Sequence, residues 1–234
     1  MTIATAPSLA GRKILLFISE DWVFCSHRLP IGVALKEAGA DVVIVTRVRD
    51  HAEPILNAGL TLRPLELDRS GANPLRDRKT VSALMRIYRE EKPDLVHNVA
   101  IKPILYGAYC AWRCRVPAVV NALTGMGSLF LANSLSARSM RPAVRQALRF
   151  LLNRRNSHTI LQNNDDVALL VQEFGVAADR IALIRGAGVD TAHFHPTPEP
   201  AGTPIAVCVS RMLRDKGIVE LVDAVAVQQP RRLD

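Results

Sequence analysis

The sequence predicts an α/β protein with a Rossmann-like, mostly parallel sheet that carries helices on both faces. Continuous apolar runs such as KILLFIS (13–19) and DVVIVT (41–46) are typical of strands buried on both faces. Helical segments separate these runs, and this regular alternation indicates βαβ units. Hydrophobic residues make up 49% of the 234-residue chain, which is enough apolar material for a sizeable core.

The elements follow from the pattern in chain order. Strands are expected at 13–19, 41–46, 60–67, 94–99, 117–123, 157–162 and 180–185. Helices are expected at 27–38, 51–58, 76–91, 103–114, 137–155 and 164–174. Gly39 and Gly59 stand where helix C-caps belong, and Pro93 follows the end of the third helix.

The domain organisation changes after residue 185. Residues 1–12 are expected to be a disordered lead, and 13–185 form the complete Rossmann-like domain. Residues 186–203 contain Gly, Pro and Thr without periodicity, which is typical of a linker. Residues 204–234 begin a second Rossmann-like domain with a strand, PIAVCV, and a helix, IVELVDAV. A single βα unit cannot bury its own apolar faces, so we expect this second domain to be truncated and the chain to be a fragment or frameshifted copy.

The charge of the chain is strongly positive and unevenly distributed. The formal net charge is +8, and no acid stands between Asp94 and Asp165. Such an excess favours an anionic partner. The four cysteines form no CxxC pair and are expected to be free thiols, so no metal site is predicted. Residues 116–137 are uncharged but rich in Gly, Asn and Ser, which favours a buried strand and a loop over a membrane span.

Polar residues follow the first and fourth strands, where open parallel sheets bind their ligands. EDWVFCSHR brings Glu20, Asp21 and His27 to the first such turn, without a GxGxxG motif. These side chains contact a substrate, or else Asp21 or Ser26 caps the next helix. His97 ends the fourth strand and is a substrate contact or a hydrogen-bonded core histidine. Lys102 opposes the dipole at a helix start, which favours a bound anion there.

Two other turns are candidates for binding anions. Thr124, Gly125 and Gly127 lie on a turn after the fifth strand, where backbone N–H groups can approach a phosphate. Arg211 and Lys216 flank the strand-to-helix turn SRMLRDKG, which suits a diphosphate.

The helix at 137–155 carries a stripe of arginines at helical spacing, made of Arg138, Arg141, Arg145 and Arg149. The stripe faces an anionic membrane surface or is a solvated face. Nucleic acid is not expected as a partner, because no binding motif is present and few aromatic residues alternate with the basic ones.

Taken in order, six segments resemble the retaining glycosyltransferases of family 4, which have the GT-B fold. They are EDWVFCSHRLP, DLVHNVAIKPILYG, VVNALTGMG, LQNNDDVALLVQEFG, IRGAGVDTAHFHP and VSRMLRDKGIVELVDAV. Within that family the chain is similar to bacterial members that build capsules and O-antigens. The resemblance implies sugar transfer from a nucleotide diphosphate sugar, UDP-linked, to a polyprenyl-diphosphate-linked acceptor. It implies no cofactor and no metal, and a cytoplasmic protein that is peripheral on the inner membrane.

The resemblance also assigns roles to residues. Arg211 and Lys216 match the pair that binds the donor diphosphate, and Gly125 and Gly127 match the loop that faces the donor phosphates. Lys102 and Gly107 match the segment after the fourth strand. The N-terminal domain holds the acceptor, which makes its polar edge residues candidate acceptor contacts: Glu20, Asp21, His27, His97, Lys102 and Thr124.

Three departures from the family pattern bear on activity. Leu123-Thr124 stands where many members have His, and Glu20-Asp21-Trp22 stands where many have glycines. The two-glutamate motif E-x7-E, which the family uses to hold the donor sugar, does not occur after residue 186. We therefore expect little or no transfer by this chain. The alternatives are a nucleotide-sugar 2-epimerase of the same fold and a non-catalytic, membrane-bound acceptor-binding module that needs a partner chain.

Overall fold

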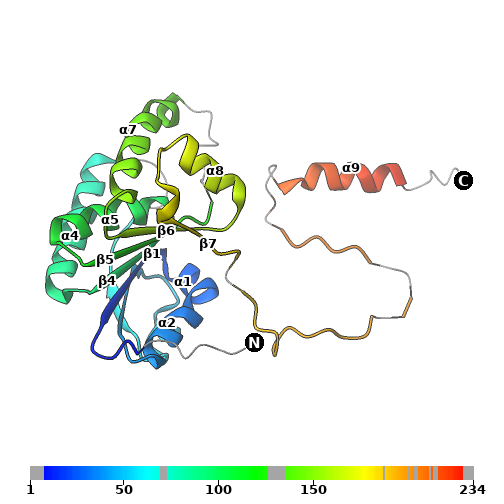
Figure 1. The fold of residues 1–234 in the computed structure, drawn as a ribbon. Helices are drawn as coiled ribbons and strands as arrows, with labels where there is room; N and C mark the ends of the chain where they lie inside the picture. The colour runs from blue at the N-terminus through cyan, green and yellow to red at the C-terminus, as the bar shows by residue number, and fades with distance from the viewer. Residues whose placement is uncertain are drawn as a thin grey trace, which may run out of the picture. The chain divides into compact units, whose positions relative to one another are not determined.

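A computed structural model describes residues 8–68, 73–125, 135–186, 188–199, 201–202, 205–210, 212 and 216–228 (Figure 1). The chain divides into two compact units, Met1–Gly188 and Val189–Asp234. The first unit contains the whole sheet, and the second contains one helix among its described residues.

The first unit is built on a seven-stranded sheet in the order β3-β2-β1-β4-β5-β6-β7. Every neighbouring pair is parallel. The strands are β1 Lys13–Glu20, β2 Asp41–Arg47, β3 Thr61–Pro64, β4 Leu95–Val99, β5 Ala118–Ala122, β6 Ser157–Leu161 and β7 Ile181–Leu183. This order has its switch point between β1 and β4, as in doubly wound sheets, and it confirms the predicted fold class.

Helices cover the sheet on both sides. They are α1 Asp21–His27, α2 Leu29–Glu37, α3 Ala52–Asn57, α4 Pro74–Glu91, α5 Ile101–Cys114, α7 Leu135–Leu152 and α8 Asn164–Gln172, with a 3-10 turn, η1, at Ala178–Arg180. Figure 1 shows α4, α5 and α7 on one face, with α1 and α2 on the other. The predicted strands and most predicted helices are confirmed to within a few residues.

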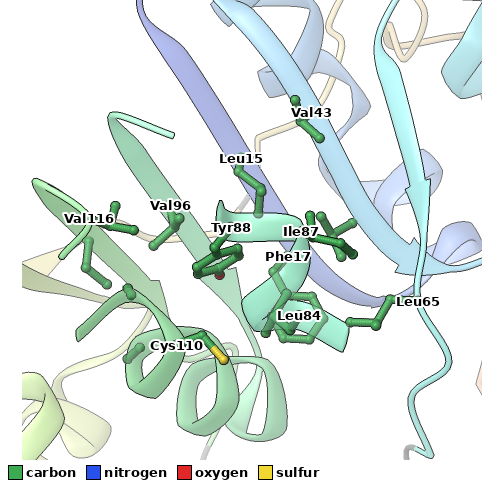
Figure 2. Packing of buried hydrophobic residues seen from close by; sticks show 14 of the residues in the cluster. Leu15, Phe17, Val43, Leu65, Leu84, Ile87, Tyr88, Val96, Cys110 and Val116 are labelled. Atoms are coloured by element: carbon green, nitrogen blue, oxygen red, sulfur yellow. The ribbon is translucent and has the colours of Figure 1, made fainter. Parts of the chain in front are cut away.

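The central strand β1 belongs to two cores because successive side chains of a strand point to opposite faces. Leu15 and Phe17 pack with Tyr88 of α4 and Cys110 of α5 (Figure 2). Leu16 and Ile18 pack with Phe24 of α1 on the other face. All four β1 side chains are 0–1% exposed, which explains why KILLFIS is continuously apolar.

The chain between β1 and β2 differs from the prediction. Instead of one helix at 27–38, α1 follows β1 directly and ends at His27, so EDWVFCSHR is helical rather than a turn. The buried carboxylate of Asp21 accepts the Trp22 N–H at 2.8 Å, which supports a helix start at the last strand residue. Pro30, in the first turn of α2, is compatible with a second helix start there.

The second unit does not contain the predicted strand. Residues 205–210 have no strand conformation and are exposed, with Val209 at 94%. The described part of this unit offers no neighbouring strand with which PIAVCV could pair. The predicted helix is confirmed as α9, Ile218–Gln228. In the segment at 116–137, β5 is confirmed, whereas most of the expected loop lies outside the described residues; among the described helices, none is long and apolar enough to cross a membrane.

Candidate functional site

The carboxyl edge of the sheet begins with two buried acids that are bound by the protein itself. The Asp21 carboxylate, fully buried, accepts the backbone N–H groups of Arg49 at 2.6 Å and His51 at 2.9 Å. Burial alone would raise the pKa of Asp21, but these bonds and that from Trp22 hold it below its ordinary value. Asp21 thus ties the loop after β2 to the end of β1, and it does not cap α2, whose N-cap is Arg28.

Glu20 links β1 to β2 through two arginines. Its carboxylate lies 3.2 Å from Arg49 Nε and 3.6 Å from Arg47 Nη1. Arg47 also reaches Glu66 at 3.7 Å and the Leu67 carbonyl at 3.5 Å. Each guanidinium has five N–H donors and both are partly exposed, so the pair retains donors for an external anion.

A cavity of about 530 Å³ opens beside this corner, where the segment after β3 meets the first turns of α4. Three cationic side chains, Arg47, Arg76 and Lys79, line it together with the acids Glu66 and Asp68. Glu66 lies 3.7 Å from Arg47, and Asp68 lies 3.4 Å from Arg76. The remaining lining residues are Pro64, Leu65, Leu67, Thr80 and Ala83. The volume is in the usual range for small-molecule pockets. The sequence analysis missed this cavity, although Arg76 and Lys79 at i, i+3 on a helix are a detectable signal.

Lys102, predicted to bind an anion, has protein partners in the structure. It lies in the first turn of α5, and its Nζ donates to the Asp68 carbonyl at 2.6 Å and to Asp77 Oδ1 at 3.3 Å. Asp77 in turn bonds the Tyr106 hydroxyl, whose pKa is raised by burial and by this carboxylate. Lys102 therefore lies next to the cavity, because Asp68 is one of the residues that line it. The ion pair between Lys102 and Asp77 gives a structural reason for a lysine at this helix start.

The turn between β4 and α5 is strained. Ala100, the N-cap of α5, has φ 79° and ψ 162°, a backbone region used almost only by glycine. Its N–H donates to the Ala122 carbonyl at 3.0 Å, which holds the turn against the end of β5. Residues kept in such conformations concentrate at ligand-binding edges, and this one lies at the carboxyl edge of a central strand.

The loop after β5 is only partly described. Leu123 is buried, Thr124 is exposed, and Gly125 has φ 137°. Gly127 lies outside the described residues. Gly107 has a packing role: a β-carbon there would collide with the side chain of buried Asn98. Its match to the family pattern therefore has a structural explanation.

His97 and His27 lie in different surroundings. His27 is exposed at the end of α1. His97 is 9% exposed, and its Nε2 has no hydrogen-bond partner in the described part of the chain. The structure thus confirms that His97 is buried, while both predicted roles, a substrate contact and a hydrogen-bonded core histidine, stay open. The adjacent Arg28, 8% exposed, was missed by the sequence analysis although it stands in the quoted EDWVFCSHRLP.

The arginine stripe on α7 is partly engaged by the protein. Arg145 lies 3.7 Å from Glu173 and stacks over Phe174, and Arg149 lies against Gly175. The side chain of Arg138 lies outside the described residues, and Arg141 also has a protein contact. Arg145 and Arg149 are nevertheless exposed, so the predicted alternatives of a membrane-facing stripe and a solvated face both stay predictions.

A second group on α5 and α7, which we call the Trp112 patch, combines aromatic and cationic side chains. Trp112 packs edge-on against Phe150 with ring centroids 5.2 Å apart, and Tyr109 packs 5.9 Å from Trp112. The Arg154 guanidinium lies 5.3 Å from the Trp112 centroid and 5.2 Å from that of Phe150. Phe150 is 47% exposed, so the patch presents an aromatic and cationic surface to solvent.

In the second unit, Lys216 is exposed just before α9, and Gly217 has φ 70°. Arg211 lies outside the described residues. All four cysteines are free, and no cluster of His, Cys, Asp or Glu that could hold a metal is found among the described residues.

The sheet order, together with polar residues and a cavity at its carboxyl edge, defines a Rossmann-like ligand-binding domain. Comparison with known proteins then identifies the family. Residues 13–164 match the Glycosyl transferase 4-like family, and the chain belongs to it. A curated relative is N,N'-diacetylbacillosaminyl-diphospho-undecaprenol alpha-1,3-N-acetylgalactosaminyltransferase of Campylobacter jejuni, 21% identical over 222 residues. The match covers 89% of this chain and 58% of that relative.

Solved structures share the fold. A glycosyltransferase from Rickettsia africae superposes with a TM-score of 0.64 at 18% identity, over 93% of this chain and 57% of its own. Sucrose-phosphate synthase from Thermosynechococcus elongatus gives 0.66 at 19% identity, over 93% of this chain and 60% of its own. A UDP-N-acetylglucosamine 2-epimerase gives 0.51 at 13% identity, over 74% of this chain and 47% of its own. These likenesses establish the fold alone, and they agree with the GT-B architecture that the resemblance implied.

Proposed function

We propose that this chain is the acceptor-binding part of a glycosyltransferase that transfers a sugar from a UDP-linked donor to a lipid-linked saccharide. The observation that carries the proposal is family membership over residues 13–164, joined to a curated relative whose name specifies a diphospho-undecaprenol acceptor. The product would serve surface polysaccharide biosynthesis. The cavity at the carboxyl edge of the first unit supports an acceptor site in this part of the chain.

The charges at that edge suit a diphosphate-linked saccharide. Arg47, Arg76 and Lys79 line the cavity, and guanidinium groups form paired hydrogen bonds with phosphate oxygens. Glu66 and Asp68 supply acceptors for sugar hydroxyl groups from the same cavity. In this proposal the acceptor's reactive hydroxyl is oriented by Glu66 or Asp68, while the cationic side chains hold its phosphates.

The donor belongs to the second unit in this proposal. Lys216 with Arg211 would hold the diphosphate of the nucleotide sugar and stabilise the charge that develops on it as the glycosidic bond breaks. In the first unit, Gly125 and Gly127 keep in this proposal the role of a turn whose backbone N–H groups can approach a phosphate. No metal or cofactor takes part.

The Trp112 patch supports a peripheral location on the cytoplasmic face of the inner membrane. Tryptophan and tyrosine favour the water–lipid interface, and arginines favour anionic headgroups. The span from residue 95 to residue 164 carries no acid that would repel such a surface. A lipid-linked acceptor would bring the enzyme to a membrane, which agrees with this location.

The test has two measurements on the 234-residue chain. Binding of a short-chain polyprenyl-diphosphate N-acetylhexosamine is measured by calorimetry, with Arg76→Gln plus Lys79→Gln as the cavity variant and exposed Arg86→Gln as the control. We expect the cavity variant to weaken binding about tenfold or more, corresponding to about 1.4 kcal/mol, and the control to leave it unchanged. No binding by the unmodified chain would contradict the acceptor-site proposal.

Sugar transfer is then measured with radiolabelled UDP-N-acetylhexosamine. We expect little or no turnover by these residues alone, because the E-x7-E motif does not occur after residue 186. Robust turnover would overturn this expectation. Conversion of UDP-N-acetylglucosamine without any acceptor would instead favour the 2-epimerase. Acceptor binding by this chain alone, with sugar transfer only after a second polypeptide is added, would favour the partner-dependent module.

A further inference from the structure

Arg28 is a buried cation whose charge the described protein does not neutralise. The residue stands between α1 and α2, where its backbone N–H donates to Phe24 and its carbonyl accepts from Gly32. The residue is 8% exposed, and burial, with no hydrogen bond or opposite charge from a described residue, lowers the pKa of its guanidinium. A guanidinium keeps its proton in proteins, so it does not escape the penalty of burial by becoming neutral. An unpaired buried charge is unfavourable unless something supplies its counter-charge.

His97 lies on the same side of the sheet as Arg28. Its Cα partner on β1 is Leu16, and neighbouring residues of parallel strands point to the same face. Leu16 packs in one cluster with Phe24 and Leu29, which stand on either side of Arg28 in the sequence. Burial and the positive charge of Arg28 lower the pKa of His97 to about 4, so its imidazole is neutral near pH 7.

The two side chains therefore place one fixed positive charge near one imidazole nitrogen that has no hydrogen-bond partner among the described residues. The acids of the same corner are engaged elsewhere: Glu20 pairs with Arg47 and Arg49, and Asp21 accepts three backbone N–H groups. A neutral imidazole can present an N–H donor at Nε2. The guanidinium can present two parallel donors to one planar or tetrahedral anion.

We infer that Arg28 and His97 form a binding site for an oxyanion, with the guanidinium donating two hydrogen bonds and His97 Nε2 donating a third. On the proposed function, on which this assignment of the ligand rests, the anion is a phosphate of the lipid-linked acceptor. The shared chemistry also fits the carboxylate of an acidic sugar. This site is distinct from the cavity lined by Arg76 and Lys79.

The experiment uses the 234-residue chain with inorganic phosphate, inorganic pyrophosphate and glucuronate as probes. Arg28→Met keeps the length of the side chain but removes its charge, and Arg86→Met, at an exposed position of α4, is the matched control. Calorimetry gives affinities, and thermal melting gives stability with and without each probe. We expect Arg28→Met to weaken phosphate binding at least about tenfold, as for loss of a bidentate charged pair, while the control changes it less than about twofold.

The melting temperature without ligand supplies a second, independent readout. Because the guanidinium is unpaired, Arg28→Met should melt at the same temperature as the parent chain or higher, and should lose the stabilisation that phosphate gives the parent. A large drop in melting temperature with unchanged phosphate affinity would overturn the inference, since it would mean that Arg28 serves the protein's own structure.

His97 is followed by its side-chain ¹⁵N resonances. Phosphate should shift Nε2 in the parent chain and in Arg86→Met, but not in Arg28→Met. An Nε2 signal that ignores every probe would overturn the role of His97. If glucuronate binds and neither phosphate nor pyrophosphate does, the assignment of the anion as a phosphate is overturned. These measurements do not depend on sugar transfer, so they can fail while the proposed function still holds in its own assay.

Discussion

The two edges of the sheet differ in how completely their buried and partly buried polar groups are paired. At the amino edge, Lys13 lies between Asp41 at 3.1 Å and Glu91 at 3.0 Å, and Arg63 pairs with Glu90 and Glu91. Asp94 accepts the Lys13 N–H at 2.8 Å and pairs with Arg12. Toward the carboxyl edge, His97 Nε2 in β4 is buried without a partner among the described residues, Arg28 is a buried residue whose pKa is lowered by burial alone, and Ala100 is strained.

The difference shows where the chain keeps conformations and charges that do not serve stability. Paired charges at the amino edge neutralise one another and need no ligand. Unpaired buried groups and a strained turn persist only where surrounding structure supports them, and such places are often ligand sites. The comparison therefore favours the carboxyl edge as the place of the proposed binding site.

The largest expected effect comes from Asp21, whose carboxylate accepts three backbone N–H groups at the carboxyl edge. Asp21→Asn replaces an acceptor oxygen by an amide that faces backbone donors, and should lower the free energy of unfolding by about 2–4 kcal/mol. Because the folded pKa of Asp21 is depressed, its contribution is full above the unfolded pKa of about 3.9 and is lost as pH falls through the folded value. Urea unfolding at pH 7 and pH 3 measures both, with exposed Asp223→Asn as control. An equal loss at both pH values would contradict the charge-based account.

Gly107→Ala tests the close packing behind the carboxyl edge. The added methyl group would collide with the side chain of Asn98, and overpacking of this kind should destabilise the fold by about 1–3 kcal/mol. The control is Arg113→Ala, at an exposed position of the same helix. Thermal or urea unfolding measures the loss, and a Gly107→Ala protein as stable as the parent would show that Asn98 can move aside.

Ala100→Gly tests whether strain is stored at the edge. Relief of the φ 79° conformation should outweigh the greater freedom of glycine in the unfolded chain, for a net gain of about 1 kcal/mol. Urea unfolding measures the gain, and Ala118→Gly at the start of β5, where no such strain exists, should lose stability. If both substitutions destabilise equally, the turn is not strained in solution.

The smallest effect is expected at the amino edge. Lys13→Gln should cost at most about 1 kcal/mol, because the ammonium is partly exposed and its two ion pairs are screened by salt. The bonds to Glu91 and Asp41 raise the pKa of Lys13, so its contribution is full below the unfolded pKa of about 10.4 and disappears as pH rises through the folded value. Unfolding in low and high salt measures it. A salt-independent loss would mean that Lys13 acts through packing of its aliphatic stem.

Local patterns were sufficient for the fold because buried parallel strands must be apolar on both faces, as β1 is. The site was less predictable. The unfavourable position of Lys102 at a helix start correctly indicates a nearby negative charge. The sequence pattern does not identify that charge as Asp77, because Asp77 is 25 residues away and only the fold brings the two together. Arg28 escaped notice because burial of a charged side chain leaves no signal in the local pattern. The strand expected at PIAVCV failed because strand formation needs a neighbour to pair with.

The buried chain of amides across three strands has a consequence for folding. Asn98 donates to Asn121 at 3.0 Å, and Asn121 donates to Ser157 at 3.0 Å, in a region otherwise filled by apolar side chains. If β4 slipped by one residue against β5, Asn98 would stand opposite Val120 or Ala122, whose side chains point to the other face. The hydrogen bond between Asn98 and Asn121 would then be lost, which would leave a buried amide N–H group and a buried amide oxygen without partners. The three residues thus favour the observed register of β4, β5 and β6 during folding, because that register allows both buried hydrogen bonds to form.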